Sequence, residues 1–251
     1  MRRTDSRCGI SMTEHKILVG TVGYTTAKRY VNTAVDVVEL TEGRQIPPKK
    51  ATAKRLREDT PGTVIFTAQM SRFLTDIPDP GITLPGDINA YGDFKVTKEN
   101  IKLWAKNAAF ARAAEAETLV LITPSSFTPS PVNLKKMETF LVEVDRDKLD
   151  VVWEPHGPWE AEQASEFAAV NGLILAVDPL RDDPPAGVTA YFRLGPFASM
   201  GSRMGVYDLE RIADNISMFK KVYCLFDTTR SLDDARNLKK ILAGEDLEEF
   251  I

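Results

Sequence analysis

Short apolar runs rich in β-branched residues recur along the chain, and each is followed by a polar or glycine-containing turn. Such runs predict buried β-strands. They fall at eight places, residues 16–22, 34–40, 63–68, 118–123, 150–154, 173–177, 188–193 and 221–226.

Apolar residues with helical spacing separate most of these strands. Residues 51–57 predict a short helix, and Thr97 is a candidate N-cap for a longer one. Apolar stripes at helical spacing follow in five places: Ile101, Trp104, Ala105, Ala108 and Ala109; Leu134, Met137, Phe140 and Leu141; Ala161, Ala164, Phe167 and Ala168; Leu209, Ile212, Ala213 and Ile216; and Leu232, Ala235, Leu238 with Ile241 or Leu242. Only a short turn-like segment is predicted after the sixth strand.

This alternation predicts an α/β fold in which residues 16–251 form a single-domain (β/α)8 TIM-like barrel. A doubly wound open sheet is the alternative. A long Pro/Gly-rich insertion over residues 69–95 follows the third strand and exceeds a simple connection, so we expect a functional loop over the site. Residues 1–15 are polar and without pattern, which predicts a flexible N-terminal tail.

Composition and charge narrow the class of protein. The length of 251 residues and 43% apolar content fit one soluble barrel. The net charge of -4 does not favour a nucleic-acid partner, although a local positive pocket remains compatible with it. No apolar run is long enough to span a membrane, and Cys8 and Cys224 form neither a CxxC pair nor a disulfide framework. We therefore predict a cytoplasmic protein; the pattern leaves its oligomeric state open.

Polar residues at the carboxyl ends of the predicted strands mark the expected site, because these ends converge on one face of a barrel. Four acids there are candidates for acid/base catalysis, or for holding a divalent cation such as Mg²⁺ or Mn²⁺: Glu39, Glu154, Asp178 and Asp227. Candidate substrate-binding residues at the same ends are Tyr24, Gln69, Ser125, His156, Trp159 and Arg193.

Several of these residues have a second interpretation. The guanidinium of Arg193 suits a carboxylate or phosphate on a ligand, or it forms a structural ion pair with Glu39 or Glu154. Asp178 and Asp227 are equally compatible with turn or cap roles.

The histidine and the tryptophans of the fifth strand end are also ambiguous. His156 is either a general base or a hydrogen-bonding surface residue, and as the only histidine near the predicted site it gives no support to a multinuclear zinc centre. Trp153 and Trp159 either stack on a sugar or base or pack in the core.

An ordered series of motifs resembles the YecE-like family, also called domain of unknown function 72 (DUF72). The motifs are residues 20–24 (GTVGY), 37–39 (VVE), 91–94 (YGDF), 123–127 (TPSSF), 153–157 (WEPHG) with Trp159, 191–195 (YFRLG) and 226–228 (FDT). The resemblance implies a TIM-like barrel whose biochemical activity is not established. This chain differs from the family pattern in having Gln69 where a lysine is usual and no histidine between Leu194 and Gly195.

Two functional hypotheses follow. The first is a hydrolase acting on a phosphate- or sugar-containing small molecule or nucleic acid, with Glu39 and Glu154 as acid/base residues or metal ligands and Arg193 as an anion clamp. The second is a ligand-binding barrel that has lost catalysis and keeps Tyr24, Arg193 and the tryptophans as a pocket. The missing lysine and histidine motivate the second hypothesis.

Overall fold

A computed structural model describes residues 15–146, 148–195 and 204–245 of the chain. Its eight strands form a closed barrel in which neighbours are parallel and follow chain order. The strands are β1 (Lys16–Val22), β2 (Val37–Leu40), β3 (Ile65–Gln69), β4 (Ala116–Thr123), β5 (Asp150–Pro155), β6 (Ile174–Val177), β7 (Thr189–Leu194) and β8 (Lys221–Phe226). The predicted barrel is therefore confirmed, and the open sheet is excluded.

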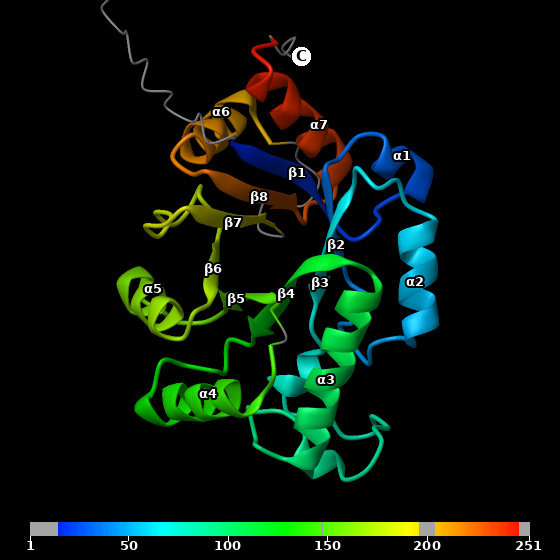
Figure 1. Cartoon of the computed structure of the whole chain (residues 1–251). Helices are drawn as coiled ribbons and strands as arrows, with labels where there is room; N and C mark the ends of the chain where they lie inside the picture. Colours follow the sequence, from blue (N-terminus) through cyan, green and yellow to red (C-terminus); the bar gives the residue numbers. More distant parts are fainter. Residues whose placement is uncertain (1–14, 147, 196–203, 246–251) are drawn as a thin grey trace, which may run out of the picture.

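Helices surround the barrel on the outside (Figure 1). They are α1 (Lys28–Asn32), α2 (Lys50–Glu58), α3 (Lys98–Ala113), α4 (Pro131–Glu143), α5 (Ala161–Val170), α6 (Val206–Ile216) and α7 (Ser231–Leu242), with two short 3-10 turns, η1 (Arg72–Leu74) and η2 (Ile88–Ala90). As predicted, β6 and β7 are joined without a helix. The predicted tail lies outside the described residues, except for the exposed His15.

The structure differs from the predicted elements in several details, among them the start of β3 at Ile65 instead of residue 63 and of β4 at Ala116 instead of residue 118. The second strand begins at Val37 instead of residue 34, because Asp36 turns its carboxylate back to the backbone N–H of Val19, at 3.2 Å. Thr97 caps α3 as predicted, accepting the N–H of Asn100 at 3.2 Å. Ala105, expected on the buried face of α3, is exposed. The short helix α1 was not predicted, since its five residues carry no helical stripe.

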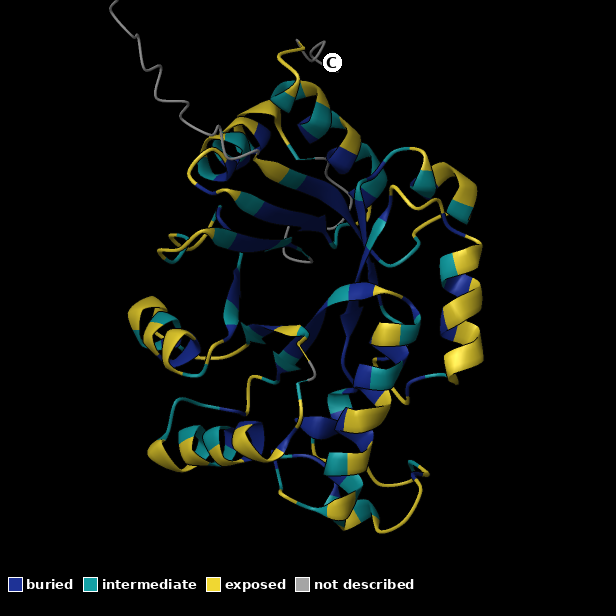
Figure 2. Cartoon of the chain, viewed as in Figure 1, coloured by how far each residue is buried: buried dark blue, intermediate teal, exposed yellow. Residues whose placement is uncertain are grey.

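Two apolar layers hold the barrel together (Figure 2). Side chains at alternate strand positions point inward and form a compact inner cluster that includes Val37, Val152, Tyr191 and Tyr223. The remaining strand positions face the helices and join a larger outer core. Because inward and outward positions alternate along each strand, polar residues point into the barrel only at the inward positions.

The insertion after β3 packs against the outside of the barrel. Phe73, Leu74 and Phe94 are buried in the outer core, and the ring of Phe94 meets that of Phe127 edge-on at 5.0 Å. None of the insertion residues lines the large cavity described below. The segment packs against the barrel, and its contacts give no support to the expectation of a loop over the cavity.

An ion cluster closes the amino-terminal end of the barrel. A shift of register between β3 and β4 brings Glu117 to Lys16 at 2.8 Å, Lys221 at 2.9 Å and the hydroxyl of Tyr223. Burial raises the pKa of Glu117, but hydrogen bonds from Lys16, Tyr223 and Lys221 outweigh it and lower the pKa to about 2.

The lowered pKa of Glu117 predicts that the folded protein loses stability in acid. The ionised carboxylate of Glu117 stabilises the fold fully above its unfolded pKa of roughly 4.3, and the contribution is lost as the pH falls toward 2. Glu117→Gln is expected to lower the urea midpoint of unfolding at pH 6. It should also make this midpoint fall less between pH 5 and pH 2.5. The exposed Glu143 gives a matched control, Glu143→Gln. An equal decline in both variants would contradict this role.

Candidate functional site

Arg193 lies at the centre of a group of carboxylates at the carboxyl ends of the strands. Its Nε donates to Oε1 of Glu39 at 3.3 Å, and its Nη1 donates to both oxygens of Glu154 at 3.2 and 2.9 Å. Its Nη2 donates to Oδ2 of Asp227 at 3.0 Å. We call these four residues the arginine cluster.

Strand alternation brings the arginine cluster together. Glu39 follows the inward-facing Val37 by two residues, Glu154 follows Val152, and Arg193 follows Tyr191. Each therefore enters the barrel one layer above the inner apolar cluster. The sequence predicted the convergence of these strand ends, and the structure shows which side chains meet.

Glu39 forms the buried floor of the arginine cluster. Its side chain is fully buried, and its carboxylate accepts hydrogen bonds from Gln69 Nε2 at 2.5 Å and the Tyr191 hydroxyl at 2.6 Å. Thr67 lies 3.0 Å from the same hydroxyl. Burial and the charge of Glu39 raise the pKa of Tyr191 far above its ordinary value, so Tyr191 stays a donor. Tyr191 was missed as a site residue, although its alternation with Arg193 placed it on the inward face.

The contacts of Arg193 favour the structural ion pair over an anion clamp. All three guanidinium nitrogens donate to carboxylates, and only 8% of the side chain is exposed. Burial alone would lower the pKa of Arg193, but Glu39, Glu154 and Asp227 raise it above its ordinary value. Arg193 is therefore held as a cation by the protein's own acids, and a ligand anion would have to displace one of them.

A cavity of about 710 Å³ lies beside the arginine cluster, at the ends of β5, β6 and β7. Glu154 and Arg193 border it on the barrel side, and α5 contributes Ala161 and Ser165. Its position matches the carboxyl-terminal face at which barrel enzymes bind their substrates. The predicted site residues on its wall are Ser125, Glu154, His156, Trp159, Asp178 and Arg193.

His156 and Glu154 form a hydrogen-bonded pair on the cavity wall. The Nε2 of His156 lies 3.0 Å from Oε1 of Glu154. Burial raises the pKa of Glu154, but the hydrogen bond to His156 and the charge of Arg193 outweigh it and lower the pKa. An ionised carboxylate only accepts hydrogen bonds, so His156 donates through Nε2, and in the neutral ring Nδ1 is the acceptor.

The loop after β5 is fixed in place around this pair. The backbone N–H of His156 donates to the carbonyl of Thr123 at 3.1 Å. Gly157 has a φ of +107°, and a Cβ there would lie 2.8 Å from the carbonyl oxygen of Ser125. Only glycine fits this approach, which holds Ser125 and His156 on the same wall.

Asp178 combines the two roles considered for it. Its Oδ1 accepts the N–H of Leu180 at 3.0 Å, as in a turn, and its side chain also borders the cavity. Burial raises the pKa of Asp178, and the neighbouring Asp182 and Asp208 raise it further against the opposing charge of Arg181.

The cavity wall carries more acids than bases. Its acids are Glu154, Glu162, Asp178, Asp182 and Asp183, and its cations are Arg181 and Arg193. Arg181 approaches Asp178 at 3.9 Å, and Arg193 belongs to the arginine cluster. The cavity therefore has negative potential.

The aromatic residues divide between core and cavity. Trp153 is fully buried and donates to Thr123 Oγ1 at 3.2 Å, so it is a core residue. Trp159 lines the cavity, packs edge-on against Trp153 at 4.8 Å and donates to the carbonyl of Phe127 at 3.1 Å.

Four predicted site residues do not line the cavity, and one of them is Glu39, the floor of the arginine cluster. Gln69 and Asp227 belong to the surroundings of Arg193 instead, and Oε1 of Gln69 is buried without a partner among the described residues. Tyr24 points toward the end of α2, where its hydroxyl lies 3.2 Å from Thr60 Oγ1. A substrate-binding role of Tyr24 therefore has no support from its contacts.

The carboxylates of the arginine cluster surround a guanidinium. Within the described residues, no group of three or more His, Cys, Asp or Glu side chains is arranged to hold a metal ion. Of the four acids predicted as candidates for holding Mg²⁺ or Mn²⁺, Glu154 and Asp178 lie on the cavity wall.

Comparisons with known proteins show which solved structures have a similar fold. No family model matches the sequence, and no curated protein matches it. A DUF72 family protein of Enterococcus faecalis superposes with a TM-score of 0.66 at 13% identity, covering 92% of this chain and 99% of that chain. A DUF72 family protein of Thermotoga maritima gives a TM-score of 0.64 at 18% identity, covering 91% and 100%.

This chain has the DUF72 barrel fold. The resemblance inferred from the motifs is thereby confirmed at the level of the fold. A xylose isomerase domain containing protein of Salmonella typhimurium is also similar, with a TM-score of 0.54 at 13% identity over 85% of this chain and 88% of that chain. Separately, no helix in the described ranges is long and apolar enough to cross a membrane.

Proposed function

We propose that the chain is a divergent DUF72 protein that hydrolyses a small polar molecule by acid–base chemistry in the cavity. The observation that carries this proposal is the Glu154–His156 pair on the cavity wall, with Glu154 anchored by Arg193. A carboxylate that fixes a histidine through one ring nitrogen is a common arrangement for a general base.

The roles of the three residues follow from their contacts. His156 accepts a proton from an attacking water through its second ring nitrogen. Glu154 stabilises the imidazolium that forms, because it is already ionised and bonded to the other ring nitrogen. Arg193 holds Glu154 in this orientation through two contacts and is a positioning residue.

The charge of the cavity narrows the substrate class. Five acids line the cavity against two arginines, and Arg193 is engaged by its own carboxylates, so the net negative wall disfavours a phosphate group. A neutral or cationic sugar-containing molecule fits the wall better, with hydroxyl or amino groups donating to carboxylates and Trp159 supplying an aromatic surface. Sugar names among barrels of similar shape agree with this class but do not carry the argument, since fold does not determine function.

A panel of chromogenic substrates tests the proposal. The p-nitrophenyl derivatives of a neutral sugar, an amino sugar and phosphate are compared at equal concentrations, with and without Mg²⁺ or Mn²⁺. We expect p-nitrophenol to be released from the neutral or the amino sugar more than about ten times faster than from the phosphate. A repulsion of about 1.4 kcal/mol between the acidic wall and the phosphate charge corresponds to that factor. Faster cleavage of the phosphate ester would contradict the substrate class.

A ligand-binding barrel without catalysis remains a second candidate. Gln69, which stands where a lysine is usual in the family pattern, bonds to Glu39, and Arg193 is saturated by carboxylates. The buried centre therefore contains no basic group free to react. Tight binding of an amino sugar in calorimetry without turnover of any substrate in the panel would favour this second function.

A further inference from the structure

The outer face of α2 and α3 carries an unusual concentration of positive charge. Residues 43–57 contain six Lys or Arg and no acid. Among the exposed cations on α2, on α3 and in the loop before α2, we define the α2–α3 basic face as Arg44, Lys49, Lys50, Lys54, Lys102 and Lys106. In a chain of net charge -4, this face is an electrostatic exception.

Packing brings the two groups of cations together. The helices α2 and α3 pack against each other, and Gly43 in the loop before α2 lies beside Asn107 of α3. Ser71 joins the two, because its hydroxyl donates to the carbonyl of Gln45 and its N–H donates to Oδ1 of Asn107 at 3.0 Å. Ile46 borders the same groove, of about 380 Å³, as Lys102 and Lys106. The cations therefore form one surface.

These cations have no acidic partners. None of the six forms an ion pair within the described residues, whereas Lys136, Lys221 and Lys239 elsewhere are paired with acids at 2.6 to 2.9 Å. Two like-charged pairs, Lys50 with Lys54 and Lys102 with Lys106, also stand four residues apart on their helices, which weakens a helix. A bound polyanion would relieve this repulsion.

We propose that the α2–α3 basic face binds the phosphate backbone of a nucleic acid. Five of its six cations are lysines, and Lys serves as a point charge for phosphates while interfaces between proteins are depleted in it. Neither α2 nor α3 exposes a large hydrophobic side chain to anchor a protein partner, and Ile46 beside them is 39% exposed. Nucleic-acid interfaces, by contrast, are polar and strongly positive.

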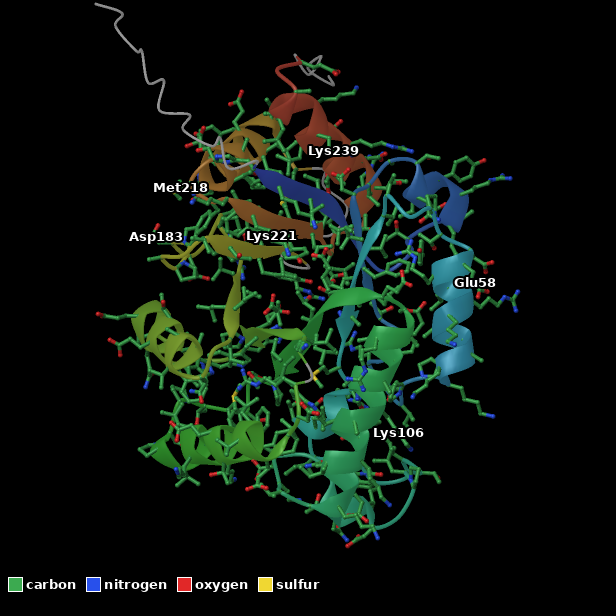
Figure 3. The ribbon with its side chains drawn as sticks, viewed as in Figure 1. Glu58, Lys106, Asp183, Met218, Lys221 and Lys239 are labelled. Atoms are coloured by element: carbon green, nitrogen blue, oxygen red, sulfur yellow. The ribbon has the colours of Figure 1, made fainter. Side chains whose placement is uncertain are left out.

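The α2–α3 basic face lies apart from the cavity. Figure 3 marks Lys106 on α3 at the right of the view and Asp183, on the cavity wall, at the left. The two surfaces have opposite charge, so nucleic acid would bind away from the acidic cavity. This binding is independent of the hydrolysis proposed for the barrel.

Fluorescence anisotropy with a labelled duplex and a labelled single strand of arbitrary sequence tests the proposal. We expect the intact chain to bind both at about 50 mM salt and to weaken steeply by about 200 mM, because binding releases counterions. Lys102→Glu with Lys106→Glu should weaken binding at least about tenfold and reduce the salt slope by about 2 on the duplex. Lys102→Gln with Lys106→Gln removes the charge without adding repulsion and should act in the same direction.

A matched pair of lysines outside the face controls for net charge. Lys135→Glu with Lys240→Glu makes the same change in total charge on α4 and α7 and should leave binding within about twofold, since exposed charges beyond a Debye length are screened. Equal losses in both double variants, or no binding by the intact chain at low salt, would overturn the proposal. So would tighter binding of poly-glutamate than of the oligonucleotides, which would identify an acidic polypeptide as the partner.

Discussion

Replacing Arg193 with methionine is expected to lower the free energy of unfolding by about 3–5 kcal/mol, because it leaves buried carboxylates without their counter-charge. Glu39 is fully buried and would keep only the neutral donors Gln69 and Tyr191. Glu154 and Asp227 would then repel Glu39 and each other in the same layer of the barrel. Urea unfolding followed by tryptophan fluorescence measures the change.

A double variant separates the charge from the packing. Glu39→Gln with Arg193→Met removes the buried acid together with its partner, and Gln69 and Tyr191 can still bond to the new amide. We expect it to recover more than half of the stability lost in Arg193→Met, as replacing a buried ion pair costs less than breaking one. If both variants were equally unstable, Arg193 would act through its volume and not through its charge.

The sequence was sufficient to predict the barrel because each strand has two local signals, an apolar run and the polar turn after it. Each apolar run is short and ends at a polar turn, and the β8 strand Lys221–Phe226 matches its predicted bounds at both ends. Errors arose where a side chain reaches beyond its own element. Asp36 turns its carboxylate to Val19, and β2 begins only after it, at Val37.

Three residues of the arginine cluster could also be predicted from the local pattern of the strands. Glu39, Glu154 and Arg193 occupy strand ends, and the two-residue period of a strand points them inward. Their pairing depends on the stagger between strands that lie far apart in sequence, which no local pattern encodes. The sequence therefore left the anion clamp and the ion pair as alternatives, and the distances to Arg193 distinguish them.

The cavity could not be predicted from strand ends alone. Its acids Glu162, Asp182 and Asp183 come from α5 and from the turn after β6, which looked like a plain connection in the sequence. Tyr24 is the opposite case, since it follows a strand but its hydroxyl contacts Thr60 and it does not line the cavity. Outside a strand, the direction in which a side chain points follows no fixed period, so the sequence alone does not place such residues.

The hydrogen bond between His156 and Glu154 on the cavity wall makes the proposed role of His156 testable by kinetics. If His156 is the base, His156→Asn should reduce kcat on the sugar substrate cleaved fastest by about 10²–10⁴-fold, which is the usual contribution of general acid–base catalysis. KM should change little, because the cavity wall is otherwise unaltered. Steady-state kinetics on the purified chain measures both constants.

Two further variants, Glu154→Gln and His15→Asn, make the test specific for the Glu154–His156 pair. Glu154→Gln should also lower kcat, because a neutral amide cannot stabilise an imidazolium, even though it still bonds to His156. His15, the second of the two histidines in the chain, is exposed and gives the matched control His15→Asn, which should leave kcat unchanged. Retention of kcat within about threefold in His156→Asn would exclude a base that contributes 10²-fold or more. Loss of kcat in Glu154→Gln alone would then assign proton transfer to Glu154, with His156 as its hydrogen-bond partner.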